Sequence, residues 1–419
     1  MKKTVRLVLA GYIVYGIAII CYFFLFAHPS IPSEWKGTAA DPATFLTPNE
    51  QLFSEQYSRW KNVLFFLSIP YDWIIYLFVL WLGIGKKLQR WGERATKWFV
   101  LQVAFYVFWL SLLVAIWTLP IDWISYRISR AYGVSTQSIS SWLHDETMDF
   151  FVQTVVFFLV ALVLYLLIRR FEKRWWLYAW LVSVPLAIFF MFIQPVVIDP
   201  LYNDFYPLKD KVLEGKILAL AEKAHIPVDH VFEVNMSEKT NALNAYVTGI
   251  GSHARIVLWD TTLTRLQERE ILFIMAHEMG HYVMKHIYWG VAGTILLILL
   301  GLFIANRVIE WLTRTSGSAF HLPKMRELAS FPLFLLVFSL FGFLASPVTN
   351  FVSRQEEHAA DEYAIELTHD PAAAISAFQK LTEAGLSEVN PPTLVKLFRY
   401  THPTIFERIV FLERMKQKE

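Results

Sequence analysis

Long apolar runs interrupt this sequence about seven times, and they constrain its fold more than any other feature. An α-helix rises about 1.5 Å per residue, so about 20 apolar residues are needed to cross the hydrocarbon core of a bilayer. Runs of this length are typical of membrane spans. The sequence therefore predicts a polytopic, mainly α-helical membrane protein with about seven transmembrane helices, near 5–27, 62–85, 98–119, 148–168, 175–198, 288–304 and 331–352.

The composition indicates a bilayer as the main solvent of this chain. Of its 419 residues, 55% are hydrophobic and 16% are aromatic, whereas only 18% are charged; about a quarter is usual in a soluble globule. The formal net charge is +2 and no basic block carries interleaved aromatic residues, so we expect no nucleic-acid partner. Cys21 is the only cysteine, which excludes an intrachain disulfide and a cysteine-based zinc cluster.

Two polar stretches, 199–287 and 353–419, are expected to form the water-facing part of the molecule. Residues 1–198 would be a five-span helical bundle, and 288–352 the last transmembrane helix pair. Within the polar stretches, 230–234 and 254–259 have strand character. Capping patterns predict three helices, from Thr264 through His286, from Asp370 to Gly385, and after Thr404 with Glu407, and a fourth helix is expected from about Arg354. Segments 28–61 and 120–147 are expected to be long loops.

The segment from His277 to His281 reads His-Glu-Met-Gly-His and fits the HExxH pattern. Since it falls in a stretch with helical capping and apolar spacing, the two histidines, four residues apart, share one face of the helix. Both imidazoles can then bind a single Zn²⁺ at about 2.0–2.1 Å, with Glu278 beside the ion as a general base. A chance match within a helix is expected in roughly a few per cent of chains of this length, so the pattern favours a zinc site.

A zinc hydrolase needs a third protein ligand and one open coordination position. Segment 353–361 contains three candidates, Glu356, Glu357 and His358. Glu357 and Asp361 lie four residues apart on one helical face, so a ligating carboxylate and an acceptor for a histidine N–H can point the same way. This spacing favours Glu357 over Glu356 and His358, although a charged run of this kind is more often a solvated helix face.

Several further motifs follow one another in a specific order along nearly the whole chain: Asp199 to Leu208, Asn244 to Tyr246, Ile256 to Thr261, His277 to His281, Ser353 and Arg354 with Glu357, Ala360 and Asp361, and His402 and Pro403 with Glu407 and Arg408. Together they resemble the type I CAAX prenyl proteases, seven-span zinc endopeptidases that cleave prenylated proteins, and more distantly the HtpX-type membrane proteases. The resemblance implies that Glu357 is the third zinc ligand. Segment 28–61 is unlike its eukaryotic counterpart, and no long insertion precedes the HExxH helix.

The resemblance also implies roles for residues outside the HExxH helix. Asn244 and Ala245 would lie on an edge strand whose backbone pairs with an extended substrate. His402 and Arg408 flank the beginning of the helix after Thr404, where the positive end of the helix dipole favours a developing oxyanion. Matching residues in the family hold the substrate and stabilise the transition state. Without the resemblance, the first pair would be an ordinary strand or turn and the second pair surface residues.

The sequence therefore predicts a membrane-embedded zinc metalloendopeptidase with one Zn²⁺ per chain and a zincin-type α+β unit. The ion would acidify its bound water, and Glu278 would accept a proton and pass it to the leaving amine. The expected partners are the lipid bilayer and a peptide or protein substrate, prenylated or membrane-associated. The alternatives are a general quality-control protease of membrane proteins and an inactive seven-span binding or transport protein, which the intact Glu278 disfavours.

The distribution of positive charge predicts the orientation in the membrane. Basic residues cluster near the N-terminus, at 86–97 and at 169–174, whereas 28–61 and 120–147 carry few. Since cytoplasmic segments are enriched in Lys and Arg, we expect a cytoplasmic N-terminus and, in a bacterium, a location in the plasma membrane. With seven spans, the metallopeptidase unit then faces the opposite side, whereas the eukaryotic relatives face theirs to the cytosol.

Overall fold

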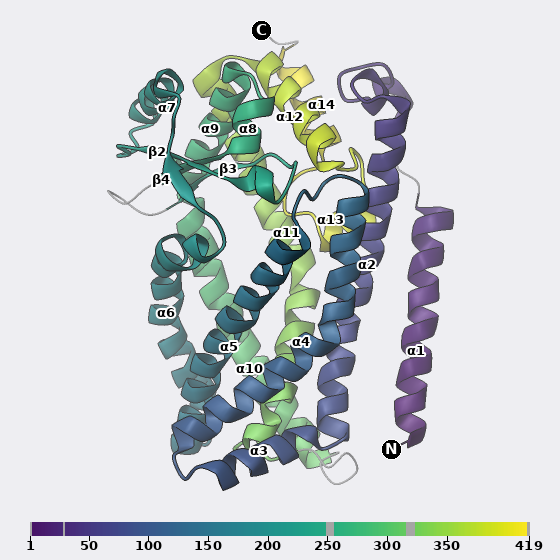
Figure 1. The fold of residues 1–419 in the computed structure, drawn as a ribbon, viewed down its shortest axis with the longest axis vertical. Coiled ribbons are helices and arrows are strands. Elements are labelled where there is room, and N and C mark those ends of the chain that lie inside the picture. The colour runs from purple at the N-terminus through teal and green to yellow at the C-terminus, as the bar shows by residue number, and fades with distance from the viewer. Residues whose placement is uncertain (1, 28–29, 249–254, 316–322, 417–419) are drawn as a thin grey trace.

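Long helices form a bundle along the vertical axis of Figure 1, and a smaller α+β unit covers one end of it. The computed structural model describes residues 2–27, 30–248, 255–315 and 323–416. Six of the described helices are long and apolar enough to cross a membrane, and the apolar helix α6, Trp175–Ile193, is shorter. The six are α1 (Lys2–Cys21, extended by a π-helical turn at Tyr22–Phe26), α2 (Pro48–Trp81), α4 (Phe99–Ala131), α5 (Ile139–Arg170), α10 (His286–Thr315) and α11 (Phe331–Thr368). The predicted polytopic, mainly helical fold is confirmed.

The bundle helices extend beyond their apolar runs, so the predicted loops at 28–61 and 120–147 are partly wrong. α2 begins within the first segment because Thr47 and Glu50 form a capping box, in which each backbone N–H donates to the other side chain. α4 continues through Pro120 into the second segment, where only the residues between α4 and α5 are not helical. The added turns of α2 reach the α+β unit, where the Ser54 hydroxyl donates to the carbonyl oxygen of Ser387.

Two helices replace the single helix predicted from Thr264 to His286. α8 spans Asp260–Arg265 and α9 spans Glu268–Val283. The capping box that opens α9 pairs Gln267 with Glu270, whose carboxylate accepts from the Gln267 backbone N–H at 2.6 Å. The predicted box therefore lies about one turn too early.

Helix α11 joins the bundle to the α+β unit in one piece. Its 38 residues include both the predicted last span and the helix expected from about Arg354. Three helices follow, and their capping residues, Asp370 for the first and Thr404 with Glu407 for the last, act as predicted. These helices are α12 (Pro371–Gly385), α13 (Thr393–Phe398) and α14 (Ile405–Lys416).

A four-stranded sheet forms the β part of the unit. Its order is β1-β2-β4-β3, with β2 parallel to β4 and the other pairs antiparallel. The strands are β1 (Phe205–Pro207), β2 (Val231–Val234), β3 (Ala245–Thr248) and β4 (Arg255–Trp259). The predicted strands correspond to β2 and β4, with residue 254 outside the described residues, and the segment expected at an edge is the edge strand β3. Neither β1 nor helix α7, Lys211–Lys223, is predicted from the sequence.

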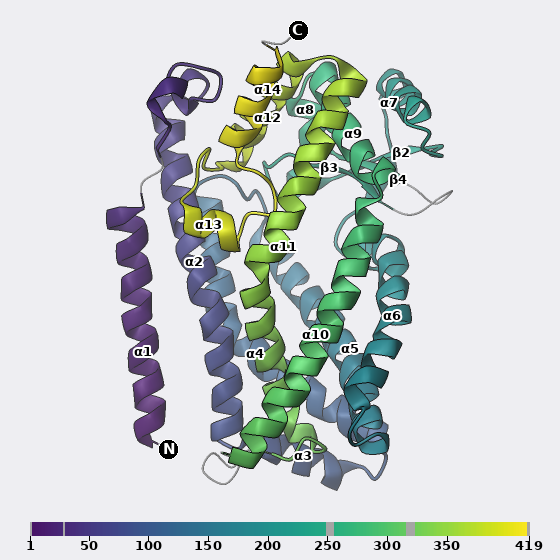
Figure 2. The same cartoon turned by 180° about the vertical axis from the view of Figure 1, so that it is seen from behind.

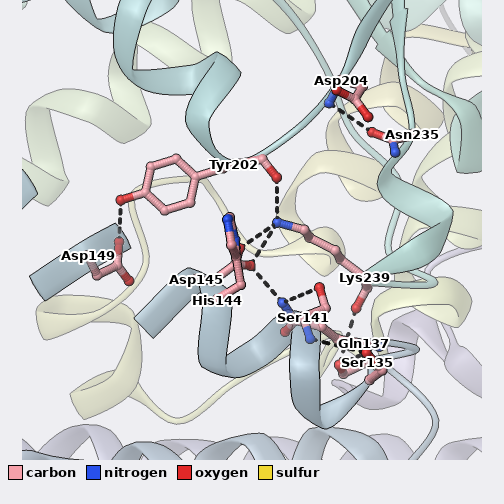
Figure 3. A network of polar contacts seen from close by, with 11 residues as sticks. Ser135, Gln137, Ser141, His144, Asp145, Asp149, Tyr202, Asp204, Asn235 and Lys239 are labelled. Atoms are coloured by element: carbon pink, nitrogen blue, oxygen red, sulfur yellow. Dashed lines mark hydrogen bonds and ion pairs between the residues drawn. The ribbon is translucent and has the colours of Figure 1, made fainter. Parts of the chain in front are cut away.

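A polar network ties the sheet to the bundle (Figure 3). Lys239, between β2 and β3, donates to the Asp145 carboxylate on α5 at 2.9 and 2.7 Å and to the Tyr202 carbonyl oxygen at 2.7 Å. The Tyr202 hydroxyl donates to Asp149 on α5 at 2.6 Å, and the Gln137 amide donates to Asp145 at 2.6 Å. These bonds hold the chain that leads into β3 against the bundle, and they fix the edge of the sheet beside the site described next.

Candidate metal centre and active site

Close packing of α9 against α11 brings two distant parts of the sequence together (Figure 2). Gly280 on α9 permits this approach, since a Cβ atom there would lie 3.3 Å from the Cα of Ala360 and 3.1 Å from the Tyr363 ring. Real Cβ atoms rarely tolerate such separations. A side chain at Gly280 would therefore push the two helices apart.

Three side chains converge where these helices meet. The Nε2 atoms of His277 and His281 on α9 lie 3.2 Å apart. On α11, Glu357 Oε2 lies 3.2 Å from His277 Nε2, and Glu357 Oε1 lies 3.3 Å from His281 Nε2. Among the described residues, the other two candidates, Glu356 and His358, are not part of this group. The face that α11 turns toward α9 therefore carries Glu357 as the third ligand of the group.

The spacing of these three side chains fits a tetrahedral metal ion. Bonds of about 2.0 Å to a tetrahedral Zn²⁺ place any two ligand atoms about 3.3 Å apart, close to the separations just given. In addition, Glu357 Oε2 is buried and accepts no hydrogen bond from the residues that the structure describes. The Arg408 guanidinium lies 3.9 Å from this oxygen, at the limit of an ion pair, so a cation at bonding distance would stabilise the buried oxygen further. The group can therefore hold a metal.

A buried ion pair lies behind His277. Asp361, whose side chain is 2% exposed, places Oδ1 2.9 Å from His277 Nδ1. The Arg408 Nε donates to Asp361 Oδ2 at 2.8 Å, and the guanidinium lies 4.0 Å from the centre of the Phe378 ring. Burial alone would lower the pKa of His277, but the neighbouring Asp361 and Glu357 carboxylates raise this pKa to about 9. A carboxylate at Nδ1 favours a proton there and leaves Nε2 as the atom that faces the ligand group.

His281 has a corresponding partner that the sequence analysis does not identify. Its Nδ1 lies 2.8 Å from Nδ1 of His286, the first residue of α10. Lys285 has a left-handed φ of 62°, which turns the chain between α9 and α10 and brings His286 back toward the centre. Residues five apart on a continuous helix do not share a face, so the spacing alone carries no signal. The two histidines meet only because the helix is interrupted at Lys285.

Glu278 lies beside this centre in a cavity of about 530 Å³. Asn244, Ala245, His402 and Arg408 line the same cavity, so the structure brings the predicted site residues together. Burial raises the pKa of the Glu278 carboxyl, while the charges of the two neighbouring imidazoles oppose that shift. A carboxylate whose pKa lies above its ordinary value is a stronger base.

His402 approaches the centre from the segment before α14. Its Nε2 lies 3.2 Å from Glu357 Oε1, and its side chain is 58% exposed. Thr401 Oγ1 lies 2.9 Å from its other ring nitrogen and orients the imidazole. Arg408, by contrast, is only 9% exposed and pairs with Asp361. His402 thus presents its imidazole to the cavity, whereas most of Arg408 is held behind the ligand group.

The edge strand β3 borders the cavity, and the backbone of Asn244 just before it is engaged within the fold. The Asn244 N–H donates to Thr262 Oγ1 at 2.9 Å, and its carbonyl oxygen accepts from the Trp259 N–H at 3.1 Å. Its side-chain oxygen accepts from the Ala245 N–H at 2.9 Å. Pairing of a substrate with this edge therefore depends on β3 from Ala245 onward rather than on the backbone of Asn244.

Comparisons with known proteins agree with this fold and centre. A model of peptidase family M48 matches residues 207–416, and a model of the five membrane helices at the N-terminus of CAAX prenyl proteases matches residues 33–204. The chain is 52% identical to the uncharacterized metalloprotease YhfN of Bacillus subtilis (strain 168) over 99% of this chain and 97% of that protein. It is 29% identical to CAAX prenyl protease 1 of Saccharomyces cerevisiae over 74% of this chain and 72% of that protein. The crystal structure of S. mikatae Ste24p has a similar fold, with a TM-score of 0.78 at 22% identity over 97% of this chain and 98% of that one.

Fold and site together define an integral, multi-pass membrane metalloprotease, whose substrates are peptides or proteins and whose cofactor is a metal. The chain belongs to peptidase family M48. The resemblance to the CAAX prenyl proteases is confirmed, and an inactive binding or transport protein is disfavoured.

The contact between His281 and His286 leads to a testable expectation for metal affinity. Removing a hydrogen-bond partner of a ligand imidazole typically costs about 10- to 100-fold in metal affinity, so His286→Ala should weaken metal binding by about that factor. Competition with a chelator measures this affinity. His358→Ala is a matched control, because His358 is exposed and its ring contacts Phe411 outside the centre. Equal affinity in the two variants would rule out the positioning role.

Proposed function

We propose that the metal is zinc, one ion per chain, held by His277, His281 and Glu357. The observation that carries this proposal is the set of ligand-atom separations of 3.2, 3.2 and 3.3 Å, close to the edges of a tetrahedron around Zn²⁺. Two imidazoles and one carboxylate are a donor set typical of zinc hydrolases. Zinc bound there would supply Lewis-acid chemistry, since it acidifies water and polarises a carbonyl oxygen.

Glu278 is the general base and acid of the proposed reaction, the hydrolysis of a peptide bond. It lines the cavity next to the ligand histidines, and burial raises the pKa of its carboxyl. It accepts a proton from the attacking water and passes it to the nitrogen of the leaving amine. The C–N bond breaks as that nitrogen is protonated, and no covalent enzyme intermediate is required.

His402 and Arg408 act on the negative charge that develops at the carbonyl oxygen. The imidazole of His402 is accessible from the cavity, where it can donate a hydrogen bond to that oxygen. Arg408 lines the cavity as well, but its guanidinium binds Asp361, so it also positions His277. The substrate lies extended along the edge of β3 from Ala245, with Asn244 beside it.

We propose prenylated or otherwise membrane-associated proteins as substrates. CAAX prenyl protease 1 of Saccharomyces cerevisiae is a relative over most of both chains. The active-site cavity is also lined by Tyr57, Ser58 and Lys61 of α2, so one wall of the cavity is a helix that continues into a candidate membrane span. A substrate anchored in the bilayer can reach the metal centre from that side.

The experiment that tests this function replaces the base. Glu278→Gln keeps the size of the side chain but cannot accept the proton, so turnover should fall by several orders of magnitude. Zinc should stay bound because the three ligands are intact. The measurement compares metal content and cleavage of a prenylated CAAX peptide and of an unfolded membrane protein, with both enzymes purified in detergent. Cleavage that survives the substitution would contradict the proposal, and cleavage of the unfolded protein alone would indicate quality control instead.

The same assay tests the role of His402. His402→Ala should retain zinc and lower kcat by about 10²-fold, because a lost hydrogen-bond donor to a developing oxyanion typically costs about 3–4 kcal/mol. Arg408→Ala, in contrast, should lose both metal affinity and turnover, because Asp361 would remain buried without its cation. Loss of zinc in His402→Ala would contradict this division of roles.

We propose a cytoplasmic N-terminus, with the metal centre on the opposite side of the membrane. The N-terminus and the α+β unit lie at opposite ends of the bundle (Figure 1). Helix α3, Ile84–Ala95, lies at the end of the N-terminus and carries four basic residues in the predicted cluster at 86–97, Lys86, Lys87, Arg90 and Arg94. In a bacterium this membrane would be the plasma membrane. A reporter fused after Lys416 should be active outside the cytoplasm, and activity inside it would overturn the orientation.

A further inference from the structure

Two basic side chains of the active-site cavity have no role in the chemistry proposed above. Lys61 projects from α2, and Arg399 belongs to the segment between α13 and α14. Both line the cavity that also contains His277 and Glu278. The Arg399 guanidinium contacts Asn62, the residue next to Lys61 on α2. The cavity therefore has a positively charged region in addition to its metal centre.

Both cations are anchored by neutral acceptors rather than by carboxylates. The Lys61 ammonium donates to the Ser125 hydroxyl on α4 at 2.8 Å, and the Arg399 guanidinium donates to the Asn62 side-chain oxygen on α2. Within the part of the chain that the structure describes, neither cation has a carboxylate oxygen at ion-pair distance. Charged groups removed from water are costly unless they are paired, and burial lowers the pKa of Arg399. Two cations that line one cavity without an ion-pair partner can together bind an anion.

Glu388 also lines the cavity, and a single carboxylate offsets at most one of the two positive charges. It forms no ion pair with Lys61 or Arg399 among the described contacts. Burial, together with repulsion by Glu55, raises the pKa of Glu388 to about 7. The region keeps a positive charge that an anionic group of the substrate can complement.

The distance from the metal centre limits what that anionic group is. Arg399 precedes His402 by three residues, so their Cα atoms lie at most about 10 Å apart even in a fully extended chain. His402 in turn reaches the ligand Glu357 at 3.2 Å. An anion bound by Arg399 is therefore on the order of a few extended residues away from the bond that is cleaved.

We propose that Lys61 and Arg399 are specificity-determining residues that bind the C-terminal carboxylate of the substrate. A planar guanidinium and an ammonium together suit a carboxylate, which can accept from both. The two cations then set the distance between the chain end and the cleaved bond. This inference rests on the proposed peptidase function and adds the feature of the substrate that the cavity selects.

The experiment compares three forms of one quenched-fluorescent prenylated CAAX peptide: the free acid, the C-terminal amide, and the amide extended by one Glu. A lost hydrogen bond between charged groups corresponds to a change of about tenfold or more. Wild-type kcat/KM should therefore be about tenfold or more higher for the acid than for either amide, mainly through KM. Arg399→Gln and Lys61→Gln should each bring the ratio of acid to amide close to one. Two variants are needed because Arg399→Gln also removes the bond to Asn62.

Arg59→Gln is the matched control, since Arg59 belongs to α2 like Lys61 but stacks over Phe24 and is not among the cavity-lining residues. It should keep the wild-type preference for the acid. Equal cleavage of acid and amide by the wild type, or a preference that survives in both cavity variants, would overturn the inference while leaving the peptidase intact. Loss of the preference in Arg59→Gln, or cleavage of the Glu-extended amide at the rate of the acid, would overturn it too. No cleavage of any form would overturn the peptidase function itself.

Discussion

The close contact between α9 and α11 is the constraint on which the rest of the structure depends. A glycine at 280 and small buried residues at Ala276, Ala360 and Ala364 allow the helix axes to approach. Only at that distance can two histidines from α9 and a glutamate from α11 meet around one ion. Because the two helices must pack this closely, the polar ligand group is surrounded by buried apolar side chains.

Helix α11 carries this constraint into the substrate side of the cavity. Arg354, about one turn before Glu357, is buried and donates to the carbonyl oxygens of Lys396 and Tyr400 at 3.0 and 2.8 Å. Those two bonds hold the segment that presents His402. Because α11 runs as one helix from the bundle to beyond the metal centre, with Pro347 inside it, membrane packing and catalytic geometry share one element, and a shift of that helix would move both.

The sequence predicts those features that depend on neighbours within one or two helical turns. The HExxH spacing and the four-residue interval between Glu357 and Asp361 are local, so both are visible without a structure. Partners that a chain turn or tertiary packing brings together are not visible: His286 meets His281 only because the chain turns between α9 and α10, and Arg408 contacts Asp361 on a different helix. Helix ends outside the apolar layer are missed for a related reason, since caps and tertiary contacts determine them rather than hydropathy.

The metal content of purified protein tests the account most directly. If α11 presents Glu357 to the two histidines, zinc should be stoichiometric in the wild type and in Glu356→Ala, and it should be lost in Glu357→Ala. Each substitution removes one glutamate carboxylate, and the two positions are adjacent on the same helix. The two variants therefore differ mainly in which face of α11 is altered. Elemental analysis after mild chelation measures the number of zinc ions per chain. Equal zinc content in the two variants, or a wild type without zinc, would contradict the assignment.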